Sequence, residues 1–272
     1  MNSDNNQSGQ SFEKYYIESR HTASALMEME DTYGAHNYHP LPVVLSRGEG
    51  VHVWDVDGKR YYDFLSAYSA VNQGHCHPKI IQALTEQVQK LTLTSRAFYN
   101  DKLGVYEKYI TEYFGFEKVL PMNTGAEAVE TALKLCRKWA YQKKQIPENN
   151  AQIVVCAENF HGRTTTIVSF SVDPDAYSDY GPFTPGFIVI PYNDVEALEK
   201  TLVENQNIAG FLVEPIQGEA GAKVPDDGYL RKSYELCNKH NVLFIADEIQ
   251  TGIARTGKLP ACDYEEVKPD IL

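Results

Sequence analysis

The feature that most constrains the fold is a series of short apolar segments that alternate with segments of helical spacing. The apolar segments, expected to be strands, span residues 118–122, 153–157, 187–191, 208–214 and 242–246. Residues 194–205 and 227–241 carry apolar side chains at helical intervals, and Asp194 is a candidate N-cap for the first of these helices. Strands that are apolar on both faces and separated by helices form a covered parallel sheet. The sequence therefore predicts an α/β fold with a mostly parallel central sheet and helices on both faces.

A second pattern lies nearer the amino terminus. In residues 51–64, two apolar stretches flank Asp57-Gly58, a pair that supplies the positive φ angles of a tight turn. This segment predicts a β-hairpin. The sequence shows no internal repeat, coiled-coil heptad or low-complexity linker. Its only candidate break between structured segments, residues 145–150, is expected to be a surface loop.

Charge and cysteine content argue against several classes of protein. The 272 residues include 25 Lys and Arg against 37 Asp and Glu, a net charge of −12, which disfavours nucleic acid or an anionic membrane as partner. No apolar run reaches the roughly 18 residues of a membrane span. The five cysteines include no C-x-x-C pair, so reduced thiols are expected. The opening MNSDNNQSGQS resembles neither a signal nor a transit peptide, and we expect a cytoplasmic protein.

Ligands of parallel α/β folds bind beyond the carboxyl ends of the strands, so the residues there are candidates for function. The first predicted strand is followed by Asn123-Thr124-Gly125-Ala126, which opens a helix with apolar residues at positions 129, 132, 133, 136 and 139. The free amides of a helix start bind anions, Gly125 would admit a phosphate closely, and Thr124 would add a hydroxyl donor. The alternative, which this segment by itself favours, is an ordinary N-cap at Thr124 with Glu127 completing a capping box.

The last predicted strand runs directly into Asp247. A carboxylate at the end of an apolar strand is costly to bury unless a cation faces it, and a protonated pyridine nitrogen would suit. Ile249 points to the same side of an extended chain and could press on the face of such a ring. The alternative is a metal ion shared by Asp247 and Glu248, but adjacent residues of a strand point in opposite directions.

The loop after residues 153–157 carries Phe160, His161 and Arg163. Phe160 could stack on a planar cofactor and Arg163 could bind a carboxylate through two hydrogen bonds. In isolation, a core phenylalanine and a surface arginine explain the same residues better. His161 could be a catalytic base, although a hydrogen-bonded structural histidine is the favoured interpretation.

Two further clusters leave their roles open. Glu214 and Glu219 follow the strand at residues 208–214 and could be a paired acid and base or could simply solvate a loop. His75-Cys76-His77 lacks the spacing of metal ligands, so a structural turn before a helix is expected there and no metal site is predicted.

The order of these motifs resembles that of the fold-type I, class III pyridoxal-phosphate aminotransferases, over nearly all of residues 30–272. Residues 34–43 (GAHNYHPLPV) and 65–75 (LSAYSAVNQGH) are most similar to the branch of this class that acts on ornithine. That branch transfers the δ-amino group of L-ornithine to 2-oxoglutarate, giving glutamate 5-semialdehyde and glutamate, in arginine and proline metabolism. The motifs at residues 123–128 and 247–252 are shared more widely across the class.

The resemblance implies a pyridoxal 5′-phosphate (PLP) site. Phe160 resembles the residue stacked on the pyridine ring, Asp247 the acid that pairs with the ring nitrogen, and Gln250 the amide near the phenolic oxygen. The complete set of expected cofactor-binding residues is Thr124, Gly125, Ala126, Phe160, Asp247, Ile249 and Gln250.

The resemblance also implies a set of substrate-binding residues. Tyr38 and Tyr68 resemble the groups that hold the α end of ornithine, so that the δ-amine reaches the cofactor. Arg163 resembles the residue that binds a carboxylate of 2-oxoglutarate, and Glu219 resembles the residue that gates between the two substrates. The family also implies a homodimer, because its sites lie at the subunit interface.

The family anchors its cofactor through a Schiff-base lysine shortly after the segment that matches residues 268–272. Lys258 and Lys268 stand at the wrong places in the motif to replace this lysine. We therefore expect no catalytic lysine before Leu272, no small domain, and no activity from this polypeptide alone. The expected organisation is a disordered or extended tail at residues 1–30, a segment with the hairpin at 31–75, and an incomplete PLP-binding large domain at 76–272.

Three alternative functions remain open within this resemblance. The protein could be an acetylornithine aminotransferase, a 4-aminobutyrate aminotransferase, or a non-catalytic relative with the same fold. Tyr38 separates the first two from an ornithine enzyme, because a free α-amino group needs a polar partner.

Overall fold

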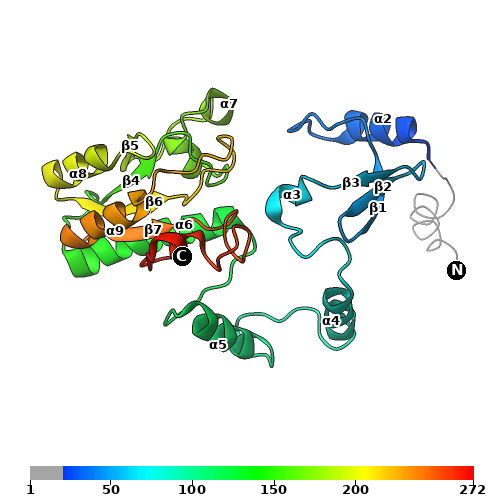
Figure 1. Cartoon of the computed structure of the whole chain (residues 1–272), viewed down its shortest axis with the longest axis horizontal. Helices are drawn as coiled ribbons and strands as arrows, with labels where there is room; N and C mark the ends of the chain where they lie inside the picture. Colours follow the sequence, from blue (N-terminus) through cyan, green and yellow to red (C-terminus); the bar gives the residue numbers. More distant parts are fainter. Residues whose placement is uncertain (1–20) are drawn as a thin grey trace, which may run out of the picture. The chain divides into compact units, whose positions relative to one another are not determined.

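The computed structural model describes residues 21–272, and the chain divides between Thr94 and Ser95 into two compact units (Figure 1). The sequence placed the boundary between residues 75 and 76. Residues 1–20 of the expected tail lie outside the described part of the chain. The rest of that tail is largely helical rather than extended, because α2 spans Ala23–Tyr33 and begins at an N-cap, Thr22, whose hydroxyl accepts a hydrogen bond from Ala25 N.

The first unit is built around a three-stranded antiparallel sheet. The strands β1 (Leu45–Glu49), β2 (His52–Asp55) and β3 (Arg60–Tyr62) pair in that order, so β2 and β3 form a hairpin within residues 51–64. At its turn, Gly58 has a φ of 85°. The helices α3 (Ser66–Ser69) and α4 (Pro78–Val88) follow, and between them His75 Nε2 lies 2.7 Å from Oδ2 of Asp63, which precedes α3.

The second unit contains a four-stranded parallel sheet in the order β5-β4-β6-β7. Its strands are β4 (Gln152–Cys156), β5 (Phe187–Ile190), β6 (Ile208–Val213) and β7 (Leu243–Ala246). Every residue of β6 is buried, as expected for a strand that has neighbours on both sides and helices on both faces. This confirms the predicted α/β fold with a parallel sheet.

Helices pack on both faces of this sheet (Figure 1). The helix α6 (Gly125–Trp139) buries Val129, Leu133 and Cys136 in one apolar cluster with alternate residues of β4. The other face is covered by α8 (Val195–Glu204) and α9 (Tyr229–Lys239), whose buried residues share a second cluster with β6 and β7. As predicted, Asp194 is the N-cap of α8, its Oδ1 accepting a hydrogen bond from Ala197 N at 2.8 Å.

Further helical segments complete the second unit. The helices α5 (Leu103–Phe114) and α7 (Pro174–Tyr177) precede and follow the region of α6 and β4 in the chain. A π-helical turn, Ala140–Lys144, extends α6, and 3-10 turns span Ile167–Phe170 and Ala261–Glu265. Of the cysteines, Cys76 is exposed and the other four are buried, with no disulfide among the five.

One expected strand is wrong. Residues 118–122 run as an irregular segment and pair with no strand within residues 21–272. One local feature disfavours a strand here, because Pro121 has no N–H to donate to a sheet, and Leu120 is accordingly 62% exposed instead of entering the core.

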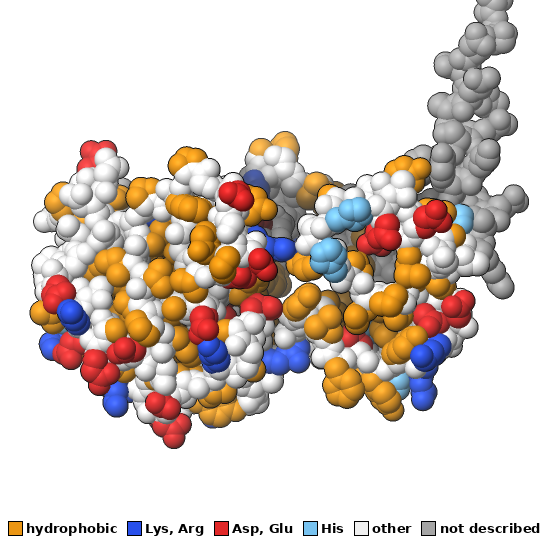
Figure 2. Space-filling model, turned by 90° about the horizontal axis from the view of Figure 1, so that it is seen from above, with side chains coloured by type: hydrophobic (Ala, Val, Ile, Leu, Met, Phe, Trp, Pro, Cys, Tyr) orange, Lys and Arg blue, Asp and Glu red, His pale blue; other side chains and the backbone are white. Residues whose placement is uncertain are grey.

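Apolar side chains are also abundant on the surface of both units (Figure 2). On α4, Ile80 and Leu84 are exposed, and on α5 Tyr106 and Tyr109 are exposed. Apolar surface of this extent is typical of a chain that contacts further protein surface.

Candidate active site

Asp247 occupies the carboxyl end of β7, where its backbone N–H donates to Val213 O at 2.9 Å. Its side chain is 7% exposed, and Oδ2 lies 2.6 Å from His161 Nδ1. Oδ1 accepts a hydrogen bond from Ile249 N at 3.1 Å. A carboxylate offers about four lone-pair positions, so these two contacts leave Asp247 able to accept a further hydrogen bond.

His161 reaches Asp247 from the loop that follows β4. Its side chain is fully buried, and its Nε2 has no hydrogen-bond partner in the part of the chain that the structure describes. An Nδ1–H donated to Asp247 orients the ring. This geometry supports the structural role expected for His161 and ties the ends of β4 and β7 together.

Glu214 ends β6, the strand between β4 and β7. It is 6% exposed, and its Oε1 accepts a hydrogen bond from Phe160 N at 2.9 Å. Burial raises the pKa of the Glu214 carboxyl to about 7, with His161 acting to lower this pKa and Asp247 adding to the increase. The position of Glu214 behind the site could not be read from the sequence, because the order of the strands in the sheet was unknown.

Glu219 is exposed and does not share the surroundings of Glu214. Its Oε1 accepts a hydrogen bond from Gln250 Nε2 at 3.0 Å. Gln250 in turn lies against Gly218, where an added Cβ would meet the Gln250 amide oxygen at 2.2 Å. The structure thus brings together two predicted site residues, Glu219 and Gln250, and it separates the two glutamates that sequence reasoning considered as a pair.

The start of α6 contacts the loops that follow β4 and β7. An added Cβ on Gly125 would lie 3.1 Å from Ile249 Cγ2, so the glycine permits close contact with the segment after Asp247. An added Cβ on Gly162, whose φ is 120°, would lie 2.8 Å from the Ala126 Cβ. The loops after β4 and β7 therefore meet at the first turn of α6.

The helix start itself combines the two interpretations that the sequence left open. Thr124 Oγ1 accepts a hydrogen bond from Glu127 N at 3.1 Å, and Glu127 Oε2 accepts one from Asn123 N at 2.8 Å, an arrangement close to a capping box. The first hydrogen bond into the helix backbone runs from Ala128 N to Thr124 O. The amides of Gly125 and Ala126 precede it, so they have no acceptor within the helix and can face an anion.

Two apolar side chains remain exposed around this junction. Phe160 is 41% exposed and Ile249 is 61% exposed, although both adjoin the buried Asp247–His161 pair. An acid with unused lone pairs, an accessible aromatic ring and a helix start with open amides together fit a flat, cationic, phosphorylated ring. Arg163 is also exposed, on the same loop as Phe160, and the next residue is fixed to α6 by a hydrogen bond of 2.5 Å from Thr164 Oγ1 to Glu130 Oε1.

Glu248 has a structural role that the sequence did not reveal. Its carboxylate accepts hydrogen bonds from Ala261 N at 2.9 Å and Cys262 N at 2.8 Å, and another from the Thr251 hydroxyl. Asp247 and Glu248, which follow the last residue of β7, therefore accept hydrogen bonds from separate partners. The only signal in the sequence was the position of Glu248 directly after an apolar strand.

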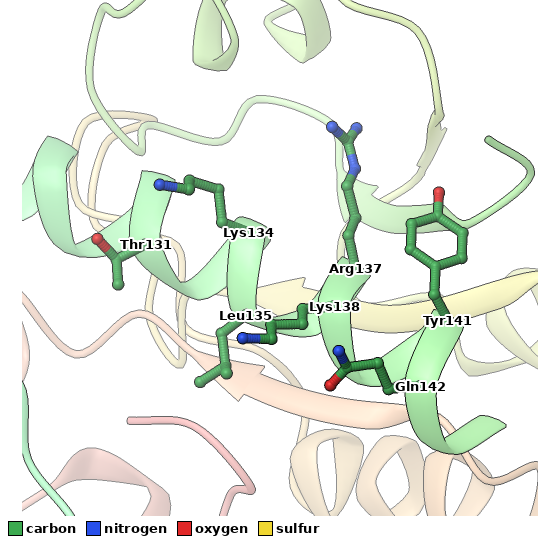
Figure 3. A pocket seen from close by; sticks show the side chains of 7 residues that line it. All are labelled: Thr131, Lys134, Leu135, Arg137, Lys138, Tyr141 and Gln142. Atoms are coloured by element: carbon green, nitrogen blue, oxygen red, sulfur yellow. The ribbon is translucent and has the colours of Figure 1, made fainter. Parts of the chain in front are cut away.

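Two predicted substrate residues belong to the first unit. Tyr38 and Tyr68 are exposed there, at 52% and 55% respectively, and their roles stay predictions. A shallow hollow on the second unit, shown in Figure 3, runs along α6 and the turn that extends it, and it contains none of the predicted site residues. Its lining residues are Thr131, Lys134, Leu135, Arg137, Lys138, Tyr141 and Gln142.

Comparison with known proteins identifies the family. The family model described as "Aminotransferase class-III" matches residues 33–272. The chain belongs to this family. Class III aminotransferases depend on PLP, which agrees with the arrangement of Asp247, Phe160 and the start of α6.

Individual class III aminotransferases show how far the similarity extends. The chain is 66% identical to the mitochondrial ornithine aminotransferase of Drosophila ananassae over 243 residues, which cover 89% of this chain and 56% of that protein. An ornithine aminotransferase from Toxoplasma gondii, with partial occupancy of PLP at its active site, superposes with a TM-score of 0.92 at 48% identity, covering 98% of this chain and 62% of that one. An acetylornithine aminotransferase from Elizabethkingia anophelis has a TM-score of 0.82 at 70% identity, covering 91% and 60%. The chain spans little more than half the length of these relatives.

The expectation of a cytoplasmic location is contradicted by these relatives. The similar proteins from Drosophila, rat, rice and Arabidopsis are named as mitochondrial ornithine aminotransferases. The composition of the first residues was therefore a poor guide to location. Within residues 21–272, no helix combines the length and the apolar character needed to cross a membrane.

Proposed function

We propose that this class III aminotransferase chain forms the PLP-binding part of an enzyme that transfers the δ-amino group of L-ornithine to 2-oxoglutarate. The observation that carries the proposal is the buried Asp247 carboxylate, oriented by His161 beside Phe160 and the start of α6, in a chain 66% identical to an ornithine aminotransferase. The products would be glutamate 5-semialdehyde and glutamate, which would connect the protein to arginine and proline metabolism.

Bound PLP would supply an electron sink for the carbon that loses its proton during transamination. The residues of the chain would orient this group and set its charge. Asp247 would hold a proton on the ring nitrogen, while Phe160 and Ile249 would pack against the ring. The amides of Gly125 and Ala126, with the Thr124 hydroxyl, would donate hydrogen bonds to the phosphate.

The proposal also assigns the residues that would select the substrates. Tyr38 and Tyr68 would hold the α end of ornithine and so direct its δ-amine toward the cofactor. Arg163 would bind a carboxylate of 2-oxoglutarate. Glu219, whose carboxylate accepts the Gln250 amide, would gate between the two substrates, and Gln250 would lie near the phenolic oxygen of PLP.

The test is an assay of the whole protein that carries this chain, loaded with PLP and supplied with ornithine and 2-oxoglutarate. Glutamate and an aldehyde should form in equal amounts, and both should require each substrate. Absence of both products, with PLP demonstrably bound, would favour a non-catalytic relative with this fold and would end the proposal.

N-Acetylornithine is the second candidate substrate, because the Elizabethkingia anophelis protein at 70% identity is named an acetylornithine aminotransferase. The ratio of kcat/KM for ornithine to that for N-acetylornithine separates the two functions. In a Tyr38→Ile variant the preference should move toward amines without a free α-amino group, including 4-aminobutyrate. Unchanged ornithine kinetics in this variant would show that Tyr38 has no such role.

The proposal includes a homodimer. The exposed apolar residues of α4 and α5 support it, because surface of this kind usually meets another protein surface. Sedimentation of the whole protein should give twice the mass of one chain at micromolar concentration.

A further inference from the structure

Glu214 links the end of β6 to the loop after β4, which carries Phe160 and His161. It stands at the end of β6, and its side chain crosses to the loop after β4, where Oε1 accepts the Phe160 N–H at 2.9 Å. The same stretch crosses a second time through Gln217, whose Nε2 donates to Ala157 O at 2.8 Å. The Tyr192 hydroxyl donates to Glu214 O at 3.1 Å, which ties in the segment after β5, the strand next to β4 in the sheet.

The loop that Glu214 contacts needs an anchor of this kind. Glu158 and Gly162 bracket Phe160, and both have positive φ angles, 57° and 120° respectively. Such a backbone is not held by strand or helix hydrogen bonds, and a non-glycine residue at positive φ is itself strained. The Phe160 ring is 41% exposed, so burial in the core does not fix its position either. The backbone of Phe160 is therefore the part of the residue that must be held.

We propose that Glu214 is a positioning residue, which holds the Phe160 backbone so that the Phe160 ring and the adjacent His161, and through His161 the Asp247 carboxylate, are placed for the cofactor. The inference rests on the proposed function for its consequence, PLP binding. The anchor itself concerns only residues of this chain. Glu214 itself would touch neither the cofactor nor a reacting atom.

The reach of the side chain distinguishes this role from a purely electrostatic one. A Glu214→Asp variant keeps the negative charge but is one methylene shorter, so its oxygens would withdraw from Phe160 N by roughly 1.5 Å. A Glu214→Gln variant loses the charge but keeps an oxygen at the same reach. If Glu214 acts as an acceptor for Phe160, aspartate should be the more damaging replacement. If the charge of Glu214 determined the effect, glutamine would be the more damaging replacement.

The first measurement is amide hydrogen exchange of the whole protein without PLP, read at Phe160. In the Asp and Ala variants this amide should exchange at least about tenfold faster than in the wild type, and in the Gln variant it should stay closer to the wild-type rate. The matched control is Glu158→Gln, which removes an exposed acid from the same loop. Glu158 pairs with Lys223 and not with the backbone of Phe160. The control should leave exchange at Phe160 unchanged.

The second measurement is PLP binding, which has two readouts. One is the dissociation constant, and the other is the visible circular dichroism of the bound cofactor, which reports the orientation of its ring. We expect the dissociation constant to rise about tenfold in the Asp and Ala variants and less in the Gln variant, with a matching loss of ellipticity. If the Ala variant does not fold, the order of the Asp and Gln variants still decides the question.

The outcomes separate the anchor from the proposed function. Equal exchange at Phe160 in the wild type and the Asp variant, or a Gln variant more damaged than the Asp variant, would overturn the positioning role. Exchange at Phe160 could be faster in the Asp variant while the wild-type protein binds no PLP. That result would support the anchor but would reject the proposed function, together with the expected effect of Glu214 on PLP binding.

Discussion

Replacing Asp247 with Asn tests the central electrostatic contact of the site. The amide nearly preserves the shape of the side chain, but only its oxygen can accept, so the variant can keep the hydrogen bond from His161 Nδ1 or the one from Ile249 N, now found at 2.6 and 3.1 Å, and not both. What it removes is the negative charge that would face the ring nitrogen. We therefore expect the variant to fold and to bind PLP, but with the pyridine nitrogen unprotonated.

The expected magnitude follows from the burial of this group. With the Asp247 side chain only 7% exposed, screening by water is weak. Two unit charges at a hydrogen-bonded distance of ~3 Å attract by about 5 kcal/mol at an effective dielectric constant of ~20. A neutral hydrogen bond to the amide would recover about 1 kcal/mol. The remaining difference of about 4 kcal/mol corresponds to a loss of about 10³-fold in kcat.

The assay measures kcat of the whole protein and, in parallel, the protonation of the ring nitrogen by ¹⁵N NMR of labelled PLP. Asp263→Asn is the matched control, because Asp263 is an exposed acid in the 3-10 turn after the site. This control should retain the activity of the wild type. An Asp247→Asn variant within about tenfold of wild-type kcat, with a protonated ring, would refute the pairing of Asp247 with the cofactor.

Three further predictions concern residues around this contact. Gly125→Ala should weaken PLP binding about fivefold, since the new Cβ would lie 3.1 Å from Ile249 Cγ2, and a cofactor titration measures this. Because burial raises the pKa of Glu214 from 4.5 to about 7, its contribution to stability is full below pH 4.5 and is lost as pH rises through about 7. Thermal unfolding between pH 4 and 8 should show this loss, on the order of 3 kcal/mol, and Glu214→Gln should flatten the profile. Glu248→Ala should lower the thermal midpoint by several degrees, because Ala261 N and Cys262 N would lose their acceptor.

Periodicity was a sound guide to most elements of the second unit, but it misassigned residues 118–122 of that unit. The apolar segments at residues 153–157 and 208–214 are strands because they can be buried on both faces, and α6 buries the apolar positions that its spacing indicated. Residues 118–122 have a similar composition, but Pro121 and the exposed Leu120 leave them outside the sheet. A short apolar segment is a strand only when a neighbouring strand accepts its hydrogen bonds, and a single sequence does not show its neighbours.

The same limit explains what could be known of the site. The chemistry of Asp247, Phe160 and Gly125 follows from their positions after strands or before a helix. The contact between His161 and Asp247 depends on β4 and β7 lying two places apart in the sheet, with β6 between them. Glu214 comes to lie behind Phe160 for the same reason, and the sequence therefore left its role undecided.

Three carboxyl groups follow the ends of the neighbouring strands β6 and β7, namely Glu214, Asp247 and Glu248. The difference between their hydrogen-bond partners indicates that the site binds a ligand. Glu214 anchors the Phe160 backbone and Glu248 holds the amides of Ala261 and Cys262, so both are explained by contacts within the chain. Asp247 is nearly buried and keeps lone pairs beyond the two contacts that it makes within the chain. A buried acid costs more in desolvation than a well-packed apolar side chain, so stability does not require an acid there. The arrangement is best explained if Asp247 is held ready, by His161 and the Ile249 amide, for a cation that comes from outside the chain.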